Sequence, residues 1–166
     1  MSITMIAAMA RNQVIGIENA MPWRLPAEMA HFRRSTIDRT VLMGRKTFES
    51  LGRPLKDRRN VILTRNAEFT TEGCEIVHSL EEAIAKYMGD DQGELVIMGG
   101  AEIYSLFMPY ADKLLLTEVD ADLVGDAYFP SFDQNEWTLL ASEPFSKDEK
   151  NAYDFQIQTY VRNKDK

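Results

Sequence analysis

Nine residues organise this chain: Ala20-Met21-Pro22-Trp23-Arg24-Leu25-Pro26-Ala27-Glu28. Both prolines disfavour helix at the residue that precedes them. A proline also suits the first position of a helix, because its missing N–H is not needed there. The pattern therefore predicts a helix over Ala27–Arg34, with Glu28 in its first turn.

The neighbours of Glu28 are apolar. Leu25, Met29 and Phe32 are spaced to share one helical face with it. Just upstream, Trp23 can rest its ring on the same surface while its indole N–H seeks a partner.

Two interpretations of Glu28 remain open from this stretch alone. An acid in the first turn commonly does no more than complement the positive end of the helix dipole. A solvated acid, however, does not usually have a tryptophan, a methionine and a phenylalanine for neighbours. Apolar walls raise the pKa of a carboxyl and a helix N-terminus lowers it. An enzyme can use such a group to hold a protonated, cationic heterocycle.

Composition predicts one soluble globular domain over residues 1–166. Apolar residues make up 45% of the chain and charged residues 27%. No apolar run approaches the roughly 20 residues that span a bilayer, and the N-terminus lacks the basic region of a signal peptide. A single cysteine, Cys74, excludes an internal disulfide, and with only two histidines we expect no structural metal. The expected setting is reducing and cytoplasmic.

Charge is distributed unevenly along the chain. The net charge is −7, yet residues 33–65 hold ten Lys/Arg against three Asp/Glu, a local net of +7. A basic segment in an acidic protein can focus attraction on a small anionic ligand. Nucleic acid is the weaker alternative, because the acidic remainder would repel a long polyanion and no basic motif interleaved with aromatic residues is present.

Apolar runs predict the strands of a buried sheet, and a later alternating pattern predicts closing antiparallel strands. We expect buried strands at 3–10, 40–44, 60–65, 74–77, 94–98 and 112–119, and closing strands at 128–130, 137–141 and 153–162. Residues 11–24 are expected to form one long loop beside the site, and loops of that length are often lids. Ser79 and Glu82 have capping-box spacing at the start of a helix over 80–87.

Two strands end in glycine and pass straight into a helix. Gly44 is followed by Arg45-Lys46-Thr47, which suits a phosphate because backbone N–H groups, the helix dipole and side-chain donors converge there. Gly99-Gly100 allows a close backbone approach at the carboxyl edge of a parallel sheet, where ligands bind. Ordinary turns remain an alternative for both, since neither is the Gly-x-Gly-x-x-Gly fingerprint.

These motifs together resemble dihydrofolate reductase of the monomeric bacterial chromosomal type, over essentially the whole chain. The resemblance rests on Val14-Ile15-Gly16, Met21-Pro22-Trp23, Leu25-Pro26-Ala27-Glu28, Met43-Gly44-Arg45-Lys46-Thr47, Gly52-Arg53-Pro54-Leu55, Gly99-Gly100-Ala101-Glu102-Ile103-Tyr104, Thr117 and Gly125-Asp126-Ala127-Tyr128-Phe129-Pro130.

The resemblance implies an α/β fold, with a central mixed, mostly parallel eight-stranded sheet flanked by about four helices. It implies reduction of 7,8-dihydrofolate to tetrahydrofolate with NADPH, which supplies one-carbon, thymidylate and purine synthesis. It further implies a monomer that binds antifolate inhibitors, without a nucleic-acid or membrane partner.

The resemblance also assigns the site. The catalytic group it implies is Glu28, Trp23, Thr117 and Tyr104, and the folate is walled by Ile6, Ala8, Met29, Phe32, Leu55 and Met98, with Arg58 on the glutamate α-carboxylate. The implied cofactor residues are Ala8, Ile15, Gly44, Arg45, Lys46, Thr47, Leu63, Thr64, Arg65, Gly99, Gly100, Ala101, Glu102 and Ile103. Arg45 and Arg65 flank the adenosine 2′-phosphate, and the Gly99–Gly100 bond matches the family's cis peptide. The lid comprises Gly16, Glu18 and Met21, braced by Asp126.

Three positions depart from the commoner pattern of the family. The acid is Glu28 where many bacterial members have aspartate, Lys56-Asp57 replaces Pro-Gly, and His31 stands where an aromatic residue is usual. We interpret His31 as a rim residue, because an isolated histidine lacks the orienting partner that a base needs.

Two other functions are compatible with parts of the pattern. A riboflavin-pathway pyrimidine reductase of the same fold would keep the NADPH site but should lack the pairing of Pro22-Trp23 and Glu28 with Arg58. A non-catalytic nucleotide- or RNA-binding module would keep the basic segment, and its affinity should fall steeply with salt.

Overall fold

A computed structural model describes residues 2–16, 25–87, 94–122 and 125–163 of the chain. Eight strands form one sheet in the order β5-β4-β3-β6-β1-β7-β10-β9. Their bounds are β1 (Ser2–Ala10), β3 (Thr40–Gly44), β4 (Arg59–Leu63), β5 (Cys74–Val77), β6 (Glu94–Ile97), β7 (Lys113–Val119), β9 (Trp137–Phe145) and β10 (Phe155–Arg162). In this sheet, each pair of neighbouring strands from β5 to β7 is parallel, and the two pairings of β10 are antiparallel. The mixed, mostly parallel sheet expected from the resemblance is confirmed.

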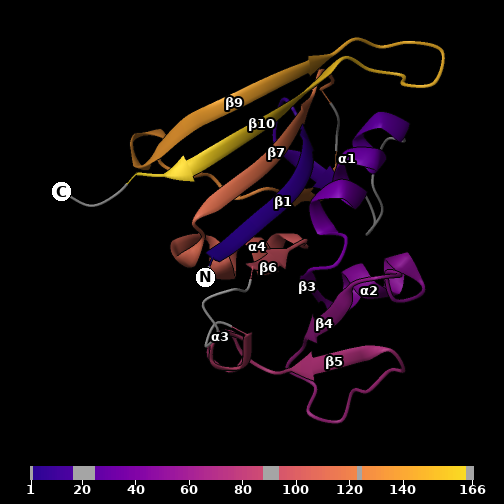
Figure 1. Ribbon diagram of the computed structural model, residues 1–166, viewed down its shortest axis with the longest axis vertical. Helices are drawn as coiled ribbons and strands as arrows, with labels where there is room; N and C mark the ends of the chain where they lie inside the picture. The colour runs from indigo at the N-terminus through magenta and orange to yellow at the C-terminus, as the bar shows by residue number, and fades with distance from the viewer. Residues whose placement is uncertain (1, 17–24, 88–93, 123–124, 164–166) are drawn as a thin grey trace.

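The described residues also form four α-helices, α1 (Pro26–Thr36), α2 (Arg45–Leu51), α3 (Leu80–Tyr87) and α4 (Ala101–Phe107). Two short 3₁₀ turns follow, η1 (Met108–Tyr110) and η2 (Gln134–Glu136). Figure 1 shows α1 and α2 beside the indigo-to-purple strands, with α3 and α4 on the other flank. The first helix begins one residue before the predicted start and runs two residues past the predicted end. Gly52 ends α2 in the left-handed conformation at φ 81°, as its position predicts.

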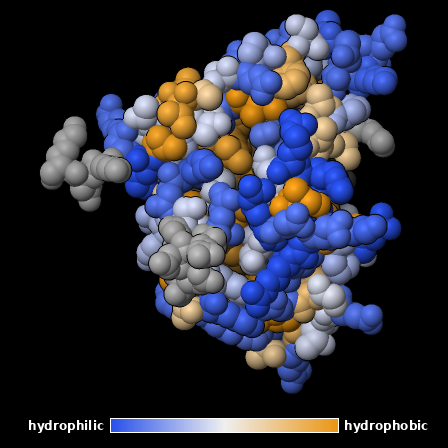
Figure 2. Space-filling model, in the orientation of Figure 1, coloured by the Kyte–Doolittle hydropathy of each residue, from blue (hydrophilic) through white to orange (hydrophobic). Residues whose placement is uncertain are grey.

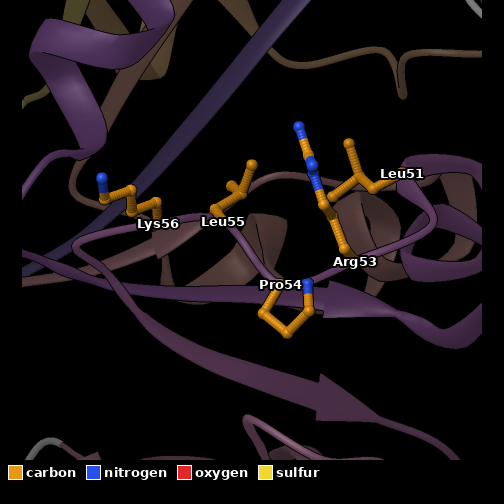
Figure 3. A pocket seen from close by; sticks show the side chains of 5 residues that line it. All are labelled: Leu51, Arg53, Pro54, Leu55 and Lys56. Carbon is orange, nitrogen blue, oxygen red and sulfur yellow. The ribbon is translucent and has the colours of Figure 1, made fainter.

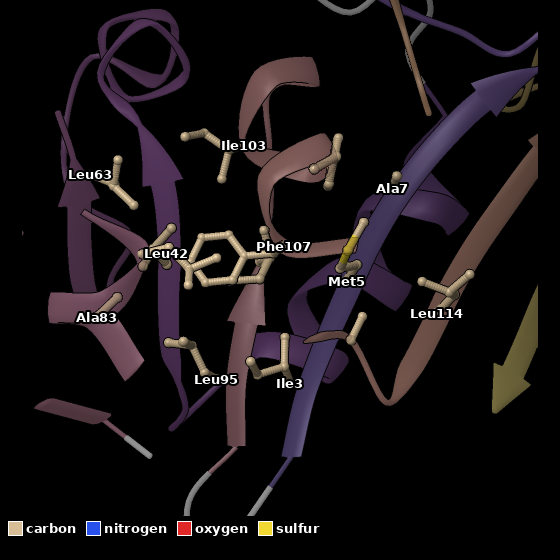
Figure 4. Close-up of a cluster of buried hydrophobic side chains, with 14 of the residues drawn as sticks. Ile3, Met5, Ala7, Leu42, Leu63, Ala83, Leu95, Ile103, Phe107 and Leu114 are labelled. Atoms are coloured by element: carbon tan, nitrogen blue, oxygen red, sulfur yellow. The ribbon is translucent and has the colours of Figure 1, made fainter. Parts of the chain in front are cut away.

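Alternation along β1 divides the core into two layers. Ile3, Met5 and Ala7 contact a cluster that includes residues of α3 and α4, whereas Ile6 belongs to a second cluster beneath α1 and α2. Figure 4 shows the first layer, in which the ring of Phe107 lies among apolar side chains from the neighbouring strands. Parallel strands require helical crossovers, so both faces of the sheet are covered and its strands are nearly continuously apolar.

The predicted loop over residues 11–24 is only partly correct. Val14–Gly16 form strand β2, which pairs antiparallel with β8 (Ala127–Tyr128) in a separate two-stranded sheet. The same pairing corrects the expectation that residues 128–130 close the main sheet. The local sequence could not reveal it, because the two partners lie more than a hundred positions apart.

The hairpin of β9 and β10 forms one end of the sheet, and β9 is the edge strand there. Figure 2 shows apolar surface over β9, where Leu139 and Leu140 are 48% and 65% exposed. The pairing of the two strands shifts register beside Thr159, where Leu140 has no partner on β10. A bulge of this kind twists an edge strand and disfavours further pairing along it.

Candidate active site

Helix α1 places Glu28 on the face that it turns toward the sheet. Leu25 is 1% exposed and Glu28 is 6% exposed, so both are buried as their spacing predicts. Burial raises the pKa of the Glu28 carboxyl from 4.5 to about 7. No described residue forms an ion pair with it. Glu28 is therefore not a solvated acid that does no more than complement the helix dipole.

Met29 departs from the predicted buried face. Its side chain is 53% exposed, whereas Phe32 is partly buried against the cluster around Ile6. Position 29 lies at the edge of the helical stripe rather than at its centre. The expectation that Met29 belongs to the buried stripe is therefore wrong for the free protein.

Tyr104 connects α4 to the central strand. Its hydroxyl donates a 2.6 Å hydrogen bond to the backbone carbonyl of Ile6. Burial raises the pKa of Tyr104, and the negative charge of Glu28 raises it further. The hydroxyl is thus a fixed hydrogen-bond donor, and Tyr104 and Glu28 lie close enough to interact electrostatically.

Thr117 supplies a buried hydroxyl on the face of the sheet that contains Ile6 and that α1 covers. It pairs in register with Ala8 of β1, two positions beyond the pairing of Ile6 with Leu115. Thr117 is 1% exposed, and its Oγ1 has no hydrogen-bond partner among the described residues. Because a buried polar atom without a partner is costly, Thr117 is suited to a ligand that brings an N–H group.

Arg58 lies at the end of the loop that precedes β4. Its Nε is buried and has no hydrogen-bond partner, and its guanidinium lies 6.0 Å from the centroid of the Phe32 ring. Burial, and then the positive charge of Arg33, lower the pKa of Arg58, while Asp57 opposes them. A carboxylate ligand would supply the missing partner.

Asn60 holds this loop in place, and the sequence analysis did not identify it. Its side chain accepts from the backbone N–H of Leu55 at 2.9 Å and donates to the carbonyls of Leu55 and Arg58 at 2.9 and 3.0 Å. Asn60 is 3% exposed. A polar residue at the start of an apolar strand was the available signal. The loop keeps its turn without the commoner glycine, because Asp57 adopts the left-handed conformation at φ 61°.

A cavity of about 480 Å³ lies along the same loop. In Figure 3 the side chains of Leu51, Arg53, Leu55 and Lys56 point to one side of the loop, and Pro54 points to the other. Leu55 also packs against the cluster that contains Phe32. The cavity therefore combines an apolar floor with cationic side chains.

At the carboxyl edge of the sheet, the backbone of Gly44 lies close to that of Gly99, as the glycines predicted. The N–H of Gly44 donates to the carbonyl of Gly99 at 2.8 Å, and the Gly99–Gly100 peptide is cis, as the resemblance implied. A Cβ on Gly99, whose φ is 109°, would lie 3.0 Å from the ring of Tyr104. A Cβ on Gly44 would lie 3.0 Å from Ile103. This hydrogen bond joins the ends of β3 and β6. The close Cβ approaches show that a side chain at Gly44 or Gly99 would crowd its neighbours.

The cations predicted for this edge are at the surface. Arg45 forms an ion pair with Glu49 at 3.1 Å and lies 4.7 Å from the centroid of the Phe69 ring. Lys46 and Arg65 are exposed, and no described acid pairs with either of them. Such cations attract an anion without a large desolvation cost.

His78 is a second residue that the sequence analysis did not identify. Its Nδ1 lies 2.9 Å from the carbonyl of Thr64, which requires Nδ1 to be the donor. Thr64 follows Leu63, the buried last residue of β4. The histidine therefore attaches the end of β5 to the strand end where three cofactor residues, Leu63, Thr64 and Arg65, were predicted.

The remaining predicted cofactor residues lie along the same edge or on β2. Ala101 begins α4, and Glu102 in its first turn is exposed. Met98, which was predicted to contact the folate, precedes the two glycines and is partly buried. A Cβ on Gly100 would lie 3.5 Å from the hydroxyl oxygen of Thr47. Ile15 is packed against the core from β2.

The predicted lid is only partly described. Gly16 ends β2 and pairs with Ala127, which directly follows Asp126. Glu18, Met21 and Trp23 lie outside the described residues.

Some classes of site and element are absent from the described part of the chain. Within residues 2–16, 25–87, 94–122 and 125–163, no three His, Cys, Asp or Glu side chains are placed to hold a metal ion. The described helices include none that is long and apolar enough to cross a membrane.

The prediction that His31 is a rim residue remains a prediction. The residue is partly buried on α1, and its Nε2 has no hydrogen-bond partner in the described structure. Burial, and then the positive charge of Arg34, lower the pKa of His31, while Glu143 on β9 opposes them.

Fold and site together define an α/β protein with two adjoining ligand regions. One is a glycine-lined sheet edge with free cations, which suits a phosphorylated nucleotide. The other comprises a buried acid, an unpartnered hydroxyl and an arginine with an unpartnered Nε, which suit a heterocycle with an anionic tail.

Comparisons with known proteins identify the family. The family model for dihydrofolate reductase matches residues 2–162. Dihydrofolate reductase of Bacillus subtilis is 41% identical over 160 residues, which cover 96% of this chain and 94% of the relative. Dihydrofolate reductase type 3 of Salmonella typhimurium is 43% identical over 164 residues, which cover 99% and 100%.

A solved structure agrees in fold. It is dihydrofolate reductase from Enterococcus faecalis complexed with NADP(H) and RAB-propyl, with a TM-score of 0.93 and 36% identity over 98% of this chain and 97% of that one. The chain belongs to the dihydrofolate reductase family, and the resemblance drawn from its motifs is confirmed.

The raised pKa of Glu28 predicts a pH-dependent stability. Below pH 4.5 the carboxyl is protonated in both the folded and the unfolded state. As the pH rises toward 7, the unfolded chain loses its proton first, so the folded state loses up to about 3 kcal/mol of stability. Glu28→Gln should remove this loss. Its unfolding free energy relative to wild type should grow by that amount between pH 4.5 and 7, as measured by urea titration.

The matched control is Glu81→Gln, which changes an exposed acid in the first turn of α3. Because this carboxyl is exposed, its replacement should not increase stability relative to wild type as the pH rises to 7. A parallel pH response of the two variants would contradict the burial argument.

Proposed function

We propose that Glu28, Thr117, Tyr104 and Arg58 bind 7,8-dihydrofolate for its NADPH-dependent reduction to tetrahydrofolate, in a single domain over residues 1–166. The reaction follows from membership of the dihydrofolate reductase family. One observation carries the residue assignment: Glu28 is a buried acid without an ion-pair partner in the described structure, on the face that also contains the unpartnered hydroxyl of Thr117.

Glu28 and Thr117 would recognise the pteridine ring. A carboxylate accepts two parallel N–H bonds, which matches the 2-amino group and the adjacent N3 side of the ring. Pairing of this kind replaces the water that Glu28 lost on burial. Ile6, Ala8 and Phe32 would wall the ring, and Met29 would be covered by the ligand rather than by the protein.

Arg58 would bind the α-carboxylate of the glutamate tail. Its unpartnered Nε and its position beside the cavity along Leu51–Lys56 support this assignment. Asn60 would keep the guanidinium aligned, through its hydrogen bond to the Arg58 carbonyl. A planar fork suits a carboxylate better than a flexible ammonium group would.

The residues at the sheet edge fit NADPH. Gly99 and Gly100 directly precede α4, and without side chains they would let a pyrophosphate approach the backbone there. Thr64, Arg65, Arg45 and Lys46 would hold the adenosine end. When bound, NADPH supplies the hydride that the reduction requires.

The protein would promote the reaction mainly by positioning and by charge. Apolar walls from β1 and α1 exclude water and hold the pteridine in one orientation. The negative charge of Glu28 favours the protonated, cationic form of the substrate, and the proton for N5 comes from water. Tyr104 would fix the geometry of β1 through its hydrogen bond to Ile6.

We further propose that the chain works as a cytoplasmic monomer without nucleic acid. The acidic net charge of −7 would repel a polyanion, and the basic segment over residues 33–65 adjoins the sites proposed for the cofactor and the substrate tail. The lid would comprise Gly16, Glu18 and Met21, with Asp126 bracing it from the start of β8.

Glu28→Gln should leave a folded protein that binds NADPH but turns over at least about 100-fold more slowly at neutral pH. The measurement is consumption of NADPH in the presence of dihydrofolate, followed by its near-ultraviolet absorbance. NADPH affinity is titrated separately by fluorescence. Activity of Glu28→Gln within about threefold of wild type would remove Glu28 from the mechanism.

Arg58→Ala should raise the KM for dihydrofolate by a factor of about 10 to 150, because the loss of a charge-assisted partner costs about 1.5 to 3 kcal/mol. The neighbouring Arg59 is a matched control, since it forms an ion pair with Glu75 on β5 instead. Arg59→Ala should leave the KM unchanged. If a pteridine without the glutamate tail loses as much affinity for Arg58→Ala as dihydrofolate does, the tail assignment is wrong.

Arg45→Ala combined with Arg65→Ala should reduce the preference for NADPH over NADH by a factor of about 100 or more. NADPH differs from NADH by one 2′-phosphate, so discrimination requires cations at that group. Both cofactors are titrated at a fixed ionic strength, since salt screens exposed charges. Equal weakening of NADPH and NADH would instead assign these arginines to the shared pyrophosphate.

A further inference from the structure

Helix α1 has no N-cap of its own. Its N-cap residue is Leu25, whose side chain offers no hydrogen-bond acceptor, and Pro26 at the next position has no N–H. The first free backbone donor of the helix is therefore the N–H of Ala27. Serine, threonine, aspartate or asparagine usually satisfies this donor from the N-cap position, and leucine is strongly disfavoured there.

The missing acceptor comes from the other end of the chain. The side-chain Oδ1 of Asn151, in the turn between β9 and β10, accepts from the N–H of Ala27 at 3.1 Å. Asn151 is 8% exposed, so its amide is largely withdrawn from water. The residue after Ala27 is Glu28, and this hydrogen bond lies in the same helical turn as the buried acid.

Asp148 determines which way the Asn151 amide faces. One carboxylate oxygen of Asp148 accepts from the backbone N–H of Lys150 and of Asn151, at 2.9 and 2.7 Å. The same oxygen accepts from Nδ2 of Asn151 at 3.1 Å. Because Nδ2 is held by a carboxylate, Oδ1 must face Ala27.

The hairpin that presents this turn is packed rigidly against the start of α1. Leu25 belongs to a buried cluster with Val119 of β7 and Phe155 of β10. The rings of Phe145 and Phe155 stack with centroids 4.8 Å apart and an interplanar angle of 5°. The side chain of Asp154 also accepts from the backbone N–H of Lys147 at 2.6 Å. The turn is thus fixed relative to the sheet on which α1 lies.

We propose that Asn151 is a positioning residue for Glu28, acting as a cap that the β9–β10 turn supplies to helix α1. The inference rests on the proposed role of Glu28 and adds a remote residue to it. Without the cap, the first turn of α1 frays, and Glu28 loses both its burial and its alignment with the ligand.

The described residues include several charged and titratable groups near this turn and Glu28. His31 and Arg34 follow Glu28 on α1, Tyr104 faces it from α4, Glu143 lies on β9, and Asp148 and Lys150 flank Asn151. None of these residues is changed in Asn151→Ala, so a shift in the titration of Glu28 reports its own burial.

The first test is Asn151→Ala, with two readouts that do not depend on catalysis. Amide hydrogen exchange at Ala27 should become about fivefold faster, as expected for the loss of one cap. A carbon-13 NMR titration of the Glu28 carboxyl in the free protein should show its pKa falling from about 7 toward the ordinary value. With dihydrofolate, kcat should fall about three- to tenfold while NADPH affinity is unchanged.

Asn151→Asp is the conservative variant. A carboxylate oxygen replaces Oδ1 as the acceptor for the N–H of Ala27, whereas the donor to Asp148 is lost and one negative charge is added. Ala27 exchange and kcat should therefore lie closer to wild type than they do in Asn151→Ala. The carboxylate now lies nearer to Glu28, so the Glu28 titration should move above its wild-type midpoint.

The outcomes separate this inference from the proposed function. If Asn151→Ala lowers only the melting temperature, with Ala27 exchange, the Glu28 titration and kcat unchanged, Asn151 is merely structural and the inference fails. If the exchange and the titration shift as described but Glu28→Gln retains full activity, the cap stands as a structural feature, and both the catalytic role of Glu28 and the positioning role of Asn151 are overturned.

Discussion

Parallel pairing of β1 with both β6 and β7 is the constraint on which the rest of the structure depends. Parallel neighbours cannot be joined by tight turns, so each connection crosses a face of the sheet and buries it. The same geometry brings the carboxyl ends of β1, β3, β4 and β6 to one edge. Glycines, hydroxyls and cations that are distant in the chain meet there because the strands run in one direction.

The site itself is built from polar groups that folding leaves unsatisfied. Glu28 is buried without an ion-pair partner in the described structure, Thr117 has an unpartnered hydroxyl, and Arg58 has an unpartnered Nε. Each of these groups costs stability in the free protein. The rest of the fold compensates through the two apolar layers on either side of the sheet. A ligand with complementary groups recovers the cost as binding energy.

Contacts between segments far apart in the chain hold these groups in position. Asn60 connects the Arg58 loop to β4, Tyr104 connects α4 to β1, and Asn151 connects the β9–β10 turn to α1. All three side chains are buried, and each makes its connection to the other element through a backbone group. Backbone targets fix the position of an element without restricting which side chain it presents. This is how one scaffold can hold three ligand-facing groups independently.

The sequence by itself determined the elements and the chemistry at their ends. Apolar runs identified the main strands, and Gly44 and the Gly99-Gly100 pair identified strand ends that pass into a helix. Gly52 and Gly99 have the positive φ that favours glycine. The proline before Glu28 identified the start of α1 almost to the residue. These signals are local, since each depends on the conformational limits of a few adjacent residues, and a linear pattern is enough to reveal them.

Only the tertiary structure decided which polar groups lack a partner and which groups obtain one from a distant residue. The pairing of β2 with β8, the exposure of Met29, the Asn60 contacts and the capping of Ala27 by Asn151 all depend on packing between segments far apart in the chain. The pKa of Glu28 belongs to the same class, because it reflects how completely other elements exclude water. Burial also depends on the assembled layers, so the local pattern around Glu28 left its two interpretations open.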